Sequence, residues 1–182
     1  MSTKTKKNLL EVIKIPEQVN VNIVDGILSI YTNLGKNEFN FKDPRILIEK
    51  ENDKILLKAI KNTRNEKKLL KTFKAHINNL INGVIKKYNY KLKICSGHFP
   101  MNVSVSNNKI IIKNFLAEKI PREAKILQDV EVEINGDVII VTGVNKEKVG
   151  QTAANIEQAC RITDKDRRIF MDGIYITSKN EE

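Results

Sequence analysis

The chain has 182 residues, and 32 Lys and Arg against 22 Asp and Glu give it a formal net charge of +10. An apolar content of 41% excludes a disordered basic tail, and no apolar run approaches the roughly 18 residues that a membrane helix needs. The positive excess predicts a polyanionic partner, either a nucleic acid or an anionic membrane surface, while an aromatic content of 5% without Trp argues against a surface that stacks single-stranded bases.

The first half is expected to form hairpins followed by a helix. Apolar residues alternate on both sides of an Asp-Gly turn over residues 19–30, which predicts a β-hairpin. Alternation over residues 38–41 predicts a further strand, and two apolar runs within residues 46–57 predict a second hairpin. From about Arg64 to Lys86 the apolar spacing changes to three and four, which is typical of an amphipathic helix.

The second half repeats this order of elements. Apolar residues alternate over 103–112 around an Asn-Asn turn, and another strand is expected over residues 120–126. Residues 130–141 predict a hairpin with an Asn-Gly turn. Asn145 then stands where a helix cap is needed, before a second apolar stripe with helical spacing.

The two halves share one hydrophobic register. Five apolar positions recur as apolar residues 82 positions later, namely Val21, Ile23, Leu28, Ile30 and Leu34. Any two α+β halves look somewhat alike, but this offset holds over four elements, so we interpret it as an internal duplication. The expected fold class is α+β: a tandem duplication of a small domain with an antiparallel sheet packed against one helix. We expect a first domain at residues 1–94, with a basic N-terminal tail, and a second at residues 95–182.

Charge is distributed unevenly between these halves. Residues 1–94 hold 20 basic and 9 acidic residues, whereas residues 95–182 hold 12 and 13. Arginine is distributed differently, because four of the six lie in the second half: Arg122, Arg161, Arg167 and Arg168. Arg makes forked, bidentate contacts with phosphate, while Lys gives a diffuse, hydrated field. Net charge is therefore a poor guide to where a specific contact is made.

The residues give little reason to expect catalysis, a metal or a cofactor. Cys95 and Cys160 cannot form a disulfide framework or a tetrahedral Cys site. His98 lies three residues after Cys95, but further metal ligands and a third group for a nucleophilic pair are missing. His76 is interpreted as a partly buried helix residue. The sequence contains neither a Gly-Lys-Ser/Thr phosphate loop nor G-x-G-x-x-G. The basic start of the chain is not followed by an apolar stretch, so we expect a cytoplasmic, reduced protein without a signal peptide.

The segment of residues 161–176 combines basic residues with Phe170 and an Asp-Gly turn before a short apolar strand. Adjacent Arg167 and Arg168 cannot both point into a core, and a rigid loop that presents Arg and Lys is well suited to bind phosphate. Three aspartates nearly balance the positive charge. From these residues alone, an ordinary surface loop is an equally weighted alternative.

Several stretches of the second half have a distinctive order of residues. They are Gly97 to Val103, Gly150 to Gln158, and a spaced set at Gln158, Ile162, Lys165, Arg168, Phe170, Asp172 to Tyr175, and Lys179. In these positions the chain resembles the large-subunit ribosomal protein L6 family in its archaeal and eukaryotic form. The resemblance covers essentially the whole chain but is weaker before Asn62, and Ala117 stands where the family usually has Gly.

The resemblance implies two copies of one small α+β fold, and a structural protein that is not an enzyme. It implies binding to large-subunit rRNA near the sarcin–ricin loop, at the stalk base, with neighbouring ribosomal proteins and translational GTPases close by. Its location is then the ribosome in the cytoplasm, with no membrane and no small-molecule substrate as partner. The resemblance also implies that the second domain makes the main RNA contacts and that the first reaches outward over the subunit.

On this basis we expect two groups of basic residues to grip RNA backbones, since double-stranded RNA is recognised by its shape, phosphates and 2′-hydroxyls. One group is Lys119, Arg122 and Lys125, and the other is Arg161, Lys165, Arg167 and Arg168. Gly150 and Gln151 are expected to begin the last helix, whose amides can meet a phosphate. The remaining candidate RNA-binding residues are Asp172, Gly173 and Lys179. Phe170 and Tyr175 are expected to anchor the loop, and Lys4, Lys6 and Lys7 to form a mobile basic arm.

Two rival functions remain at this stage. An RNA-processing or RNA-modifying factor needs a constellation of His, Glu or nucleotide-binding Gly residues, which the sequence does not offer. A basic protein–protein adaptor would use the exposed face of the first helix, where Lys67, Lys68 and Lys71 lie.

Overall fold

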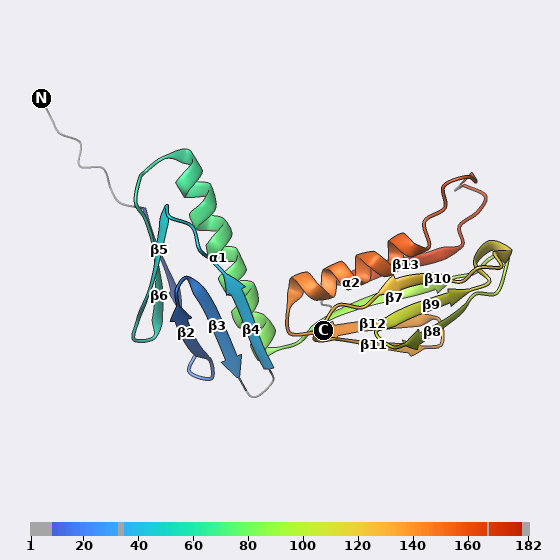
Figure 1. Cartoon of the computed structure of the whole chain (residues 1–182), viewed down its shortest axis with the longest axis horizontal. Coiled ribbons are helices and arrows are strands. Elements are labelled where there is room, and N and C mark those ends of the chain that lie inside the picture. Colours follow the sequence, from blue (N-terminus) through green and yellow to red (C-terminus); the bar gives the residue numbers. More distant parts are fainter. Residues whose placement is uncertain (1–8, 33–34, 167, 180–182) are drawn as a thin grey trace, which may run out of the picture. The chain divides into compact units, whose positions relative to one another are not determined.

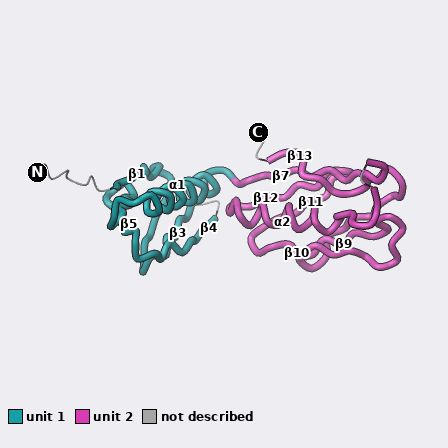
Figure 2. Tube along the Cα trace, turned by 90° about the horizontal axis from the view of Figure 1, so that it is seen from above, with its two compact units in different colours: residues 1–86 teal, residues 87–182 magenta. Residues whose placement is uncertain are grey.

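The computed structural model describes residues 9–32, 35–166 and 168–179. The chain divides into two compact units, Met1–Lys86 and Lys87–Glu182 (Figure 2). Each unit combines antiparallel strands with one long helix (Figure 1). The α+β class expected from the sequence is confirmed, with the refinement that each unit contains two small sheets.

The described residues of unit 1 form two three-stranded antiparallel sheets and one helix. The first sheet has the order β1-β6-β5, with β1 (Leu10–Lys14), β5 (Ile46–Glu51) and β6 (Lys54–Ala59). The second has the order β2-β3-β4, with β2 (Asn20–Val24), β3 (Ile27–Thr32) and β4 (Gly35–Asn40). The helix is α1 (Arg64–Ile85), as its apolar spacing predicts.

The core of unit 1 forms where α1 contacts strands of both sheets. The apolar stripe of the helix, including Leu70 and Ile77, is buried, and so are Leu28, Ile30 and Leu57 on the strands. Full burial of each such large apolar side chain contributes about 1.5–3 kcal/mol to the free energy of unfolding. The positively charged face of α1 is left in solvent, as Lys67, Lys68 and Lys71 are all exposed.

Unit 2 has a four-stranded and a three-stranded antiparallel sheet. The larger has the order β11-β12-β7-β13, with β7 (Tyr88–Cys95), β11 (Val130–Asn135), β12 (Val138–Gly143) and β13 (Gly173–Lys179). The smaller has the order β10-β9-β8, with β8 (Asn102–Ser106), β9 (Lys109–Lys113) and β10 (Arg122–Lys125). A short 3-10 turn, Phe115–Ala117, and the helix α2 (Lys146–Ala159) complete the unit.

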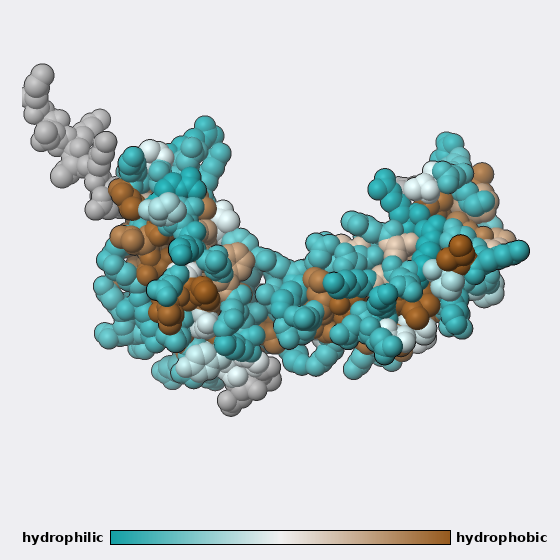
Figure 3. Space-filling view, viewed as in Figure 1, coloured by the Kyte–Doolittle hydropathy of each residue, from teal (hydrophilic) through white to brown (hydrophobic). Residues whose placement is uncertain are grey.

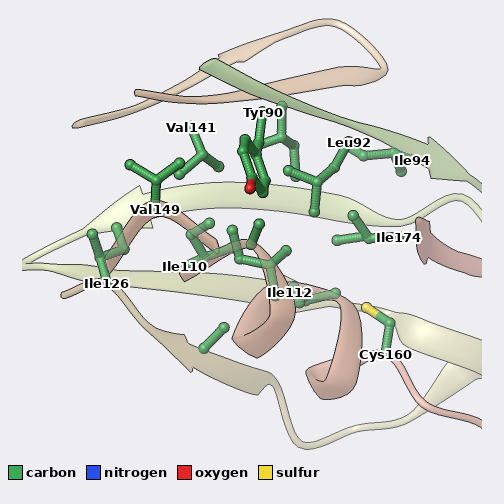
Figure 4. Packing of buried hydrophobic residues seen from close by; sticks show 14 of the residues in the cluster. Tyr90, Leu92, Ile94, Ile110, Ile112, Ile126, Val141, Val149, Cys160 and Ile174 are labelled. Carbon is green, nitrogen blue, oxygen red and sulfur yellow. The ribbon is translucent and has the colours of Figure 1, made fainter. Parts of the chain in front are cut away.

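The core of unit 2 is a continuous apolar cluster between α2 and its strands (Figure 4). Leu92, Ile110, Ile112 and Val141 come from the strands and are fully buried, and Val149 comes from the helix. The Asn145 side chain caps α2, because its Oδ1 accepts hydrogen bonds from the amides of Glu147 and Lys148 at 2.9 and 3.2 Å. The cap expected from the sequence is thus confirmed.

The hairpins of the two units have the same register. Val21 lies opposite Ile30 in unit 1, and Val103 lies opposite Ile112 in unit 2, an offset of 82 on both strands. In both hairpins the turn residues have positive φ, at Asp25 and Gly26 in the first and at two asparagines in the second. The paired strands therefore support the internal duplication inferred from the sequence.

The division between the units lies eight residues before the expected boundary at 94/95. Strand β7 pairs with β12 through Leu92 and Ile139, just as β1 pairs with β6 through Ile13 and Ile55. It therefore opens the second copy, although the sequence analysis gave these residues to the first. The alternating pattern of β7 identifies a strand but not its partner, which is chosen by long-range pairing.

Within the part of the chain that the structure describes, no helix is long and apolar enough to cross a membrane. The same residues contain no group of three or more His, Cys, Asp or Glu side chains arranged to hold a metal ion.

Candidate nucleic-acid interface

The loop between α2 and β13 carries five of the twelve predicted contact residues. It projects beyond the end of α2, as the orange-red segment in Figure 1 shows. Arg161, Lys165 and Arg168 on this loop are exposed. Arg167 lies outside the described residues, so its prediction is unchanged. We call the segment Arg161–Asp172 the basic loop.

Asp166 organises the tip of the basic loop. Its Oδ1 accepts a hydrogen bond from the Arg168 amide at 2.9 Å, which closes a tight turn. The Arg168 Nη2 lies 2.8 Å from Asp166 Oδ2, and its side chain is 90% exposed. Side-chain and backbone hydrogen bonds from Arg168 lower the pKa of Asp166. The carboxylate orients the guanidinium without removing it from solvent, so an RNA phosphate can still reach it.

Lys165 lies over an aromatic ring at the base of the loop. Its Nζ is 4.9 Å from the centroid of the Phe170 ring, close enough for a cation–π contact. Phe170 in turn packs against the His98 ring, with centroids 4.8 Å apart. The expectation that Phe170 anchors the loop agrees with this packing. The Tyr175 hydroxyl donates to the Met171 carbonyl at 3.3 Å.

Asp172 is buried and bonded to His98, so it faces no solvent. The His98 amide donates to Asp172 Oδ1 at 2.9 Å, and His98 Nδ1 lies 2.7 Å from Asp172 Oδ2. Burial raises the pKa of Asp172, but hydrogen bonds from His98 and the Gly97 amide lower the pKa by more than burial raises it. The pKa of Asp172 is therefore below the usual 3.8. Asp172 was predicted to contact RNA directly, but a carboxylate that is 1% exposed is not accessible to a phosphate.

Arg122 is occupied by contacts within the protein. Its guanidinium pairs with Glu118, with an Nη2 to Oε1 distance of 2.6 Å, and stacks 4.3 Å from the Phe115 ring centroid. Its Nη1 also donates to the carbonyls of Ala159 and Arg161 at 2.9 and 3.1 Å. Arg122 was predicted to bind RNA, but these bonds use its donors to fasten the basic loop to the end of α2. The contact also brings exposed Lys119, three residues away in the chain, to the same end of unit 2 as Arg161.

Lys125 belongs to a different surface. It lies opposite Lys109 in the β9–β10 pair, at the other end of a four-residue strand from Arg122, or about 10 Å away at the usual rise per residue. Lys125, Lys109 and Lys148 line one pocket. Acidic side chains accompany two of these lysines, since Lys109 pairs with Glu123 at 2.8 Å and Lys148 with Asp129 at 2.6 Å. The structure therefore does not group Lys125 with the basic loop.

Three further predicted residues also lie away from the basic loop. Gly150 and Gln151 are the fifth and sixth residues of α2, where amides donate within the helix and none is left for a phosphate. They therefore do not begin the helix as expected. Lys179 is exposed at the far end of β13. Gly173, at the start of this strand, is buried, and a Cβ there would lie 3.0 Å from the Tyr175 hydroxyl.

Sequence reasoning considered His98 only as a metal ligand or nucleophile partner and so missed its role as the partner of Asp172. The two residues are 74 positions apart, and no local pattern links them. It also missed Lys109 and Lys148, which join Lys125 only because β9 and α2 meet beside β10.

The comparisons with known proteins agree with this architecture. A family model described as "Ribosomal protein L6" matches residues 99–173, which include the basic loop. The chain is 48% identical over 179 residues to "Large ribosomal subunit protein uL6" of Staphylothermus marinus, covering 96% of this chain and 97% of that protein. It is 44% identical over 171 residues to the protein of that name in Methanococcus vannielii, covering 93% of each.

Proposed function

Since this chain belongs to the ribosomal protein L6 family, we propose that it binds large-subunit rRNA chiefly through the basic loop of unit 2. Family membership makes it a structural constituent of the large ribosomal subunit, located with the ribosome in the cytoplasm, and not an enzyme. Its partners are accordingly rRNA and other ribosomal proteins. The finer proposal is that it lies near the sarcin–ricin loop at the stalk base, where it supports the site of translational GTPases.

The observation that carries this proposal is a group of exposed cations on a loop fixed at several points. Lys165 and Arg168 are held over Phe170 and beside Asp166, and Arg122 fastens the start of the loop. Because little of the loop has to be ordered on binding, less affinity is lost to conformational entropy. A fixed set of cations suits the regular phosphate spacing of double-stranded RNA.

The number of phosphates contacted can be measured by titrating the full-length protein with an in vitro transcript of the source organism's large-subunit rRNA. The logarithm of the binding constant falls linearly with the logarithm of salt concentration, with a slope of roughly 0.7–0.9 for each neutralised phosphate. We expect Lys165→Ala with Arg168→Ala to weaken binding at least about tenfold and to reduce the slope by about two contacts. Arg167→Ala with Arg168→Ala is expected to behave alike.

The matched control removes two exposed lysines from unit 1, with Lys67→Ala and Lys68→Ala on α1. We expect this control to change affinity much less. A larger loss in the control than in the loop variant would contradict the proposed surface and favour the first helix.

Sedimentation separates the two rival functions. We expect the protein to sediment with large subunits and to be released once the RNA is digested. An adaptor would stay in complexes that survive ribonuclease and high salt. An RNA-processing factor would leave altered RNA ends or modified nucleotides after incubation with the transcript.

A further inference from the structure

We infer that the pair formed by buried Asp172 and exposed His98 positions the cations of the basic loop for RNA. This inference rests on the proposed function, because it assigns a role to residues that support the same loop. The pair joins residues 74 positions apart. It ties the end of the basic loop to the segment that follows β7, on which Gly97 and His98 lie.

The pair is built for a fixed geometry. An ionised Asp side chain has only acceptors, so His98 Nδ1 carries the proton in the 2.7 Å contact. The His98 amide supplies a second bond at 2.9 Å, and the Gly97 amide a third. With hydrogen bonds to both of its oxygens, the carboxylate is restricted in position and rotation. Charge-assisted bonds of this kind are shorter and about twice as strong as neutral ones.

Two ring contacts connect the Asp172–His98 pair to the Lys165 ammonium. His98, held by Asp172, packs on Phe170 at 4.8 Å, and Phe170 lies under the Lys165 ammonium at 4.9 Å. The four side chains therefore form a continuous series from the buried carboxylate of Asp172 to the exposed charge of Lys165. Arg168 is two residues before Phe170, whose amide donates to the Asp166 carbonyl at 2.9 Å. Displacing Phe170 consequently disturbs both Lys165 and Arg168.

The two ends of the basic loop are fastened by different devices. Arg122 holds its start through the Arg161 carbonyl, and the Asp172–His98 pair holds its end. Between them the side chains of residues 163–169 are all exposed where they are described, so few packing contacts restrain this stretch. Apparent affinity falls in proportion to the fraction of molecules in the binding-competent conformation. Loss of the pair should therefore weaken RNA binding even in a folded protein.

The test uses the full-length chain, the rRNA transcript and four variants, with Lys165→Ala added alone and in the His98→Ala background for a double-mutant cycle. His98→Ala and Asp172→Ala break the pair, while in His98→Asn the amide nitrogen stands near the position of Nδ1 and can still donate to Asp172. His76→Ala is the matched control, because His76 also stacks on a Phe ring, that of Phe39 at 4.9 Å, but in unit 1. Thermal unfolding is recorded for each variant so that binding is compared only where the protein is folded.

We expect His98→Ala and Asp172→Ala to reduce affinity about tenfold, as a fall of the competent fraction to one tenth requires. The salt slope should fall by about one contact, and His98→Asn should recover much of both losses. A double-mutant cycle gives the sharper result: Lys165→Ala should weaken binding less in the His98→Ala background than in the wild type. His76→Ala should leave both affinity and slope unchanged.

Additive effects of Lys165→Ala and His98→Ala would overturn the inference, because His98 would then affect binding independently of Lys165. Unchanged affinity in all folded pair variants would overturn it too. Both results differ from failure of the proposed function, in which the wild-type protein itself would not bind the transcript. Should Asp172→Ala not fold, His98→Ala and His98→Asn still decide the question, because the carboxylate then keeps its bonds from the backbone.

Discussion

The two units share a strand register but end differently. The segment that only the second unit has is the one that carries the candidate binding residues. After α1, the chain of unit 1 passes directly into β7 of unit 2. After α2, the chain forms the basic loop and returns as β13, which pairs with β7. Among the described residues, the corresponding strand of unit 1, β1, pairs on one side only, with β6. The second copy thus has an added strand on an edge that the first leaves open, and the added segment carries the candidate binding residues.

Charge follows the same division once the boundary is corrected. Unit 1 holds 17 basic and 9 acidic residues, and unit 2 holds 15 and 13. The net positive charge therefore lies mainly in unit 1, although the arginines lie mainly in unit 2. A lysine-rich surface attracts a polyanion from a distance, whereas fixed Arg and Lys groups set where it is bound.

The largest expected effect tests whether the two cores are energetically separate. Leu57 in unit 1 and Leu92 in unit 2 are both fully buried, so Leu57→Ala and Leu92→Ala should each cost about 2–5 kcal/mol. Each should destabilise its own unit, as hydrogen exchange resolved by residue would show in the two variants. Leu47→Ala, at a side chain that is 52% exposed, is the control with little expected effect. Equal loss of protection in both units would mean that they unfold together.

An intermediate effect compares an arginine from each unit. Arg122→Ala leaves the carbonyls of Ala159 and Arg161 without their donor and should cost unit 2 about 1–3 kcal/mol. Arg45 makes a similar pair with Asp43 at 2.7 Å, but on the connection between β4 and β5, where the Arg45 side chain is exposed. Arg45→Ala should therefore change stability far less. Urea denaturation of both variants measures this, and equal losses would remove the distinction between them.

The smallest effect is a difference in reaction rate at two thiols, both in unit 2. Burial raises the pKa of Cys160 to about 11, so little of the reactive thiolate exists at pH 8. Cys95 is partly exposed and should react first with a thiol reagent. Cys160 should react only as unit 2 opens, faster in Leu92→Ala than in Leu57→Ala. Rapid reaction of both thiols in the native protein would contradict the burial of Cys160.

Local features of the fold were predictable from the sequence, and long-range ones were not. The Asp25-Gly26 turn, the Asn145 cap and the stripe of α1 depend on neighbouring residues, and all three appear where they were expected. The partner of β7 depends on pairing across the sheet, which an alternating pattern does not specify.

The candidate site divides in the same way. Lys165 and Arg168 are exposed as predicted, because charged side chains in a polar loop have few alternatives to facing solvent. Arg122 and Asp172 instead face inward, toward Glu118 and His98. Residue type identified them as charged groups of the site, but only their neighbours in space show that their charges are already matched.

The added strand β13 also affects when, during synthesis, the protein becomes able to bind RNA. Strand β13 follows every other element of unit 2 in the chain, and the basic loop lies between α2 and this strand. A growing chain that has not reached Gly173 already contains every cation of the loop but has no anchored end for it. Recognition of RNA by a fixed loop would then begin only late in synthesis. Incomplete chains would carry the positive charge without the geometry.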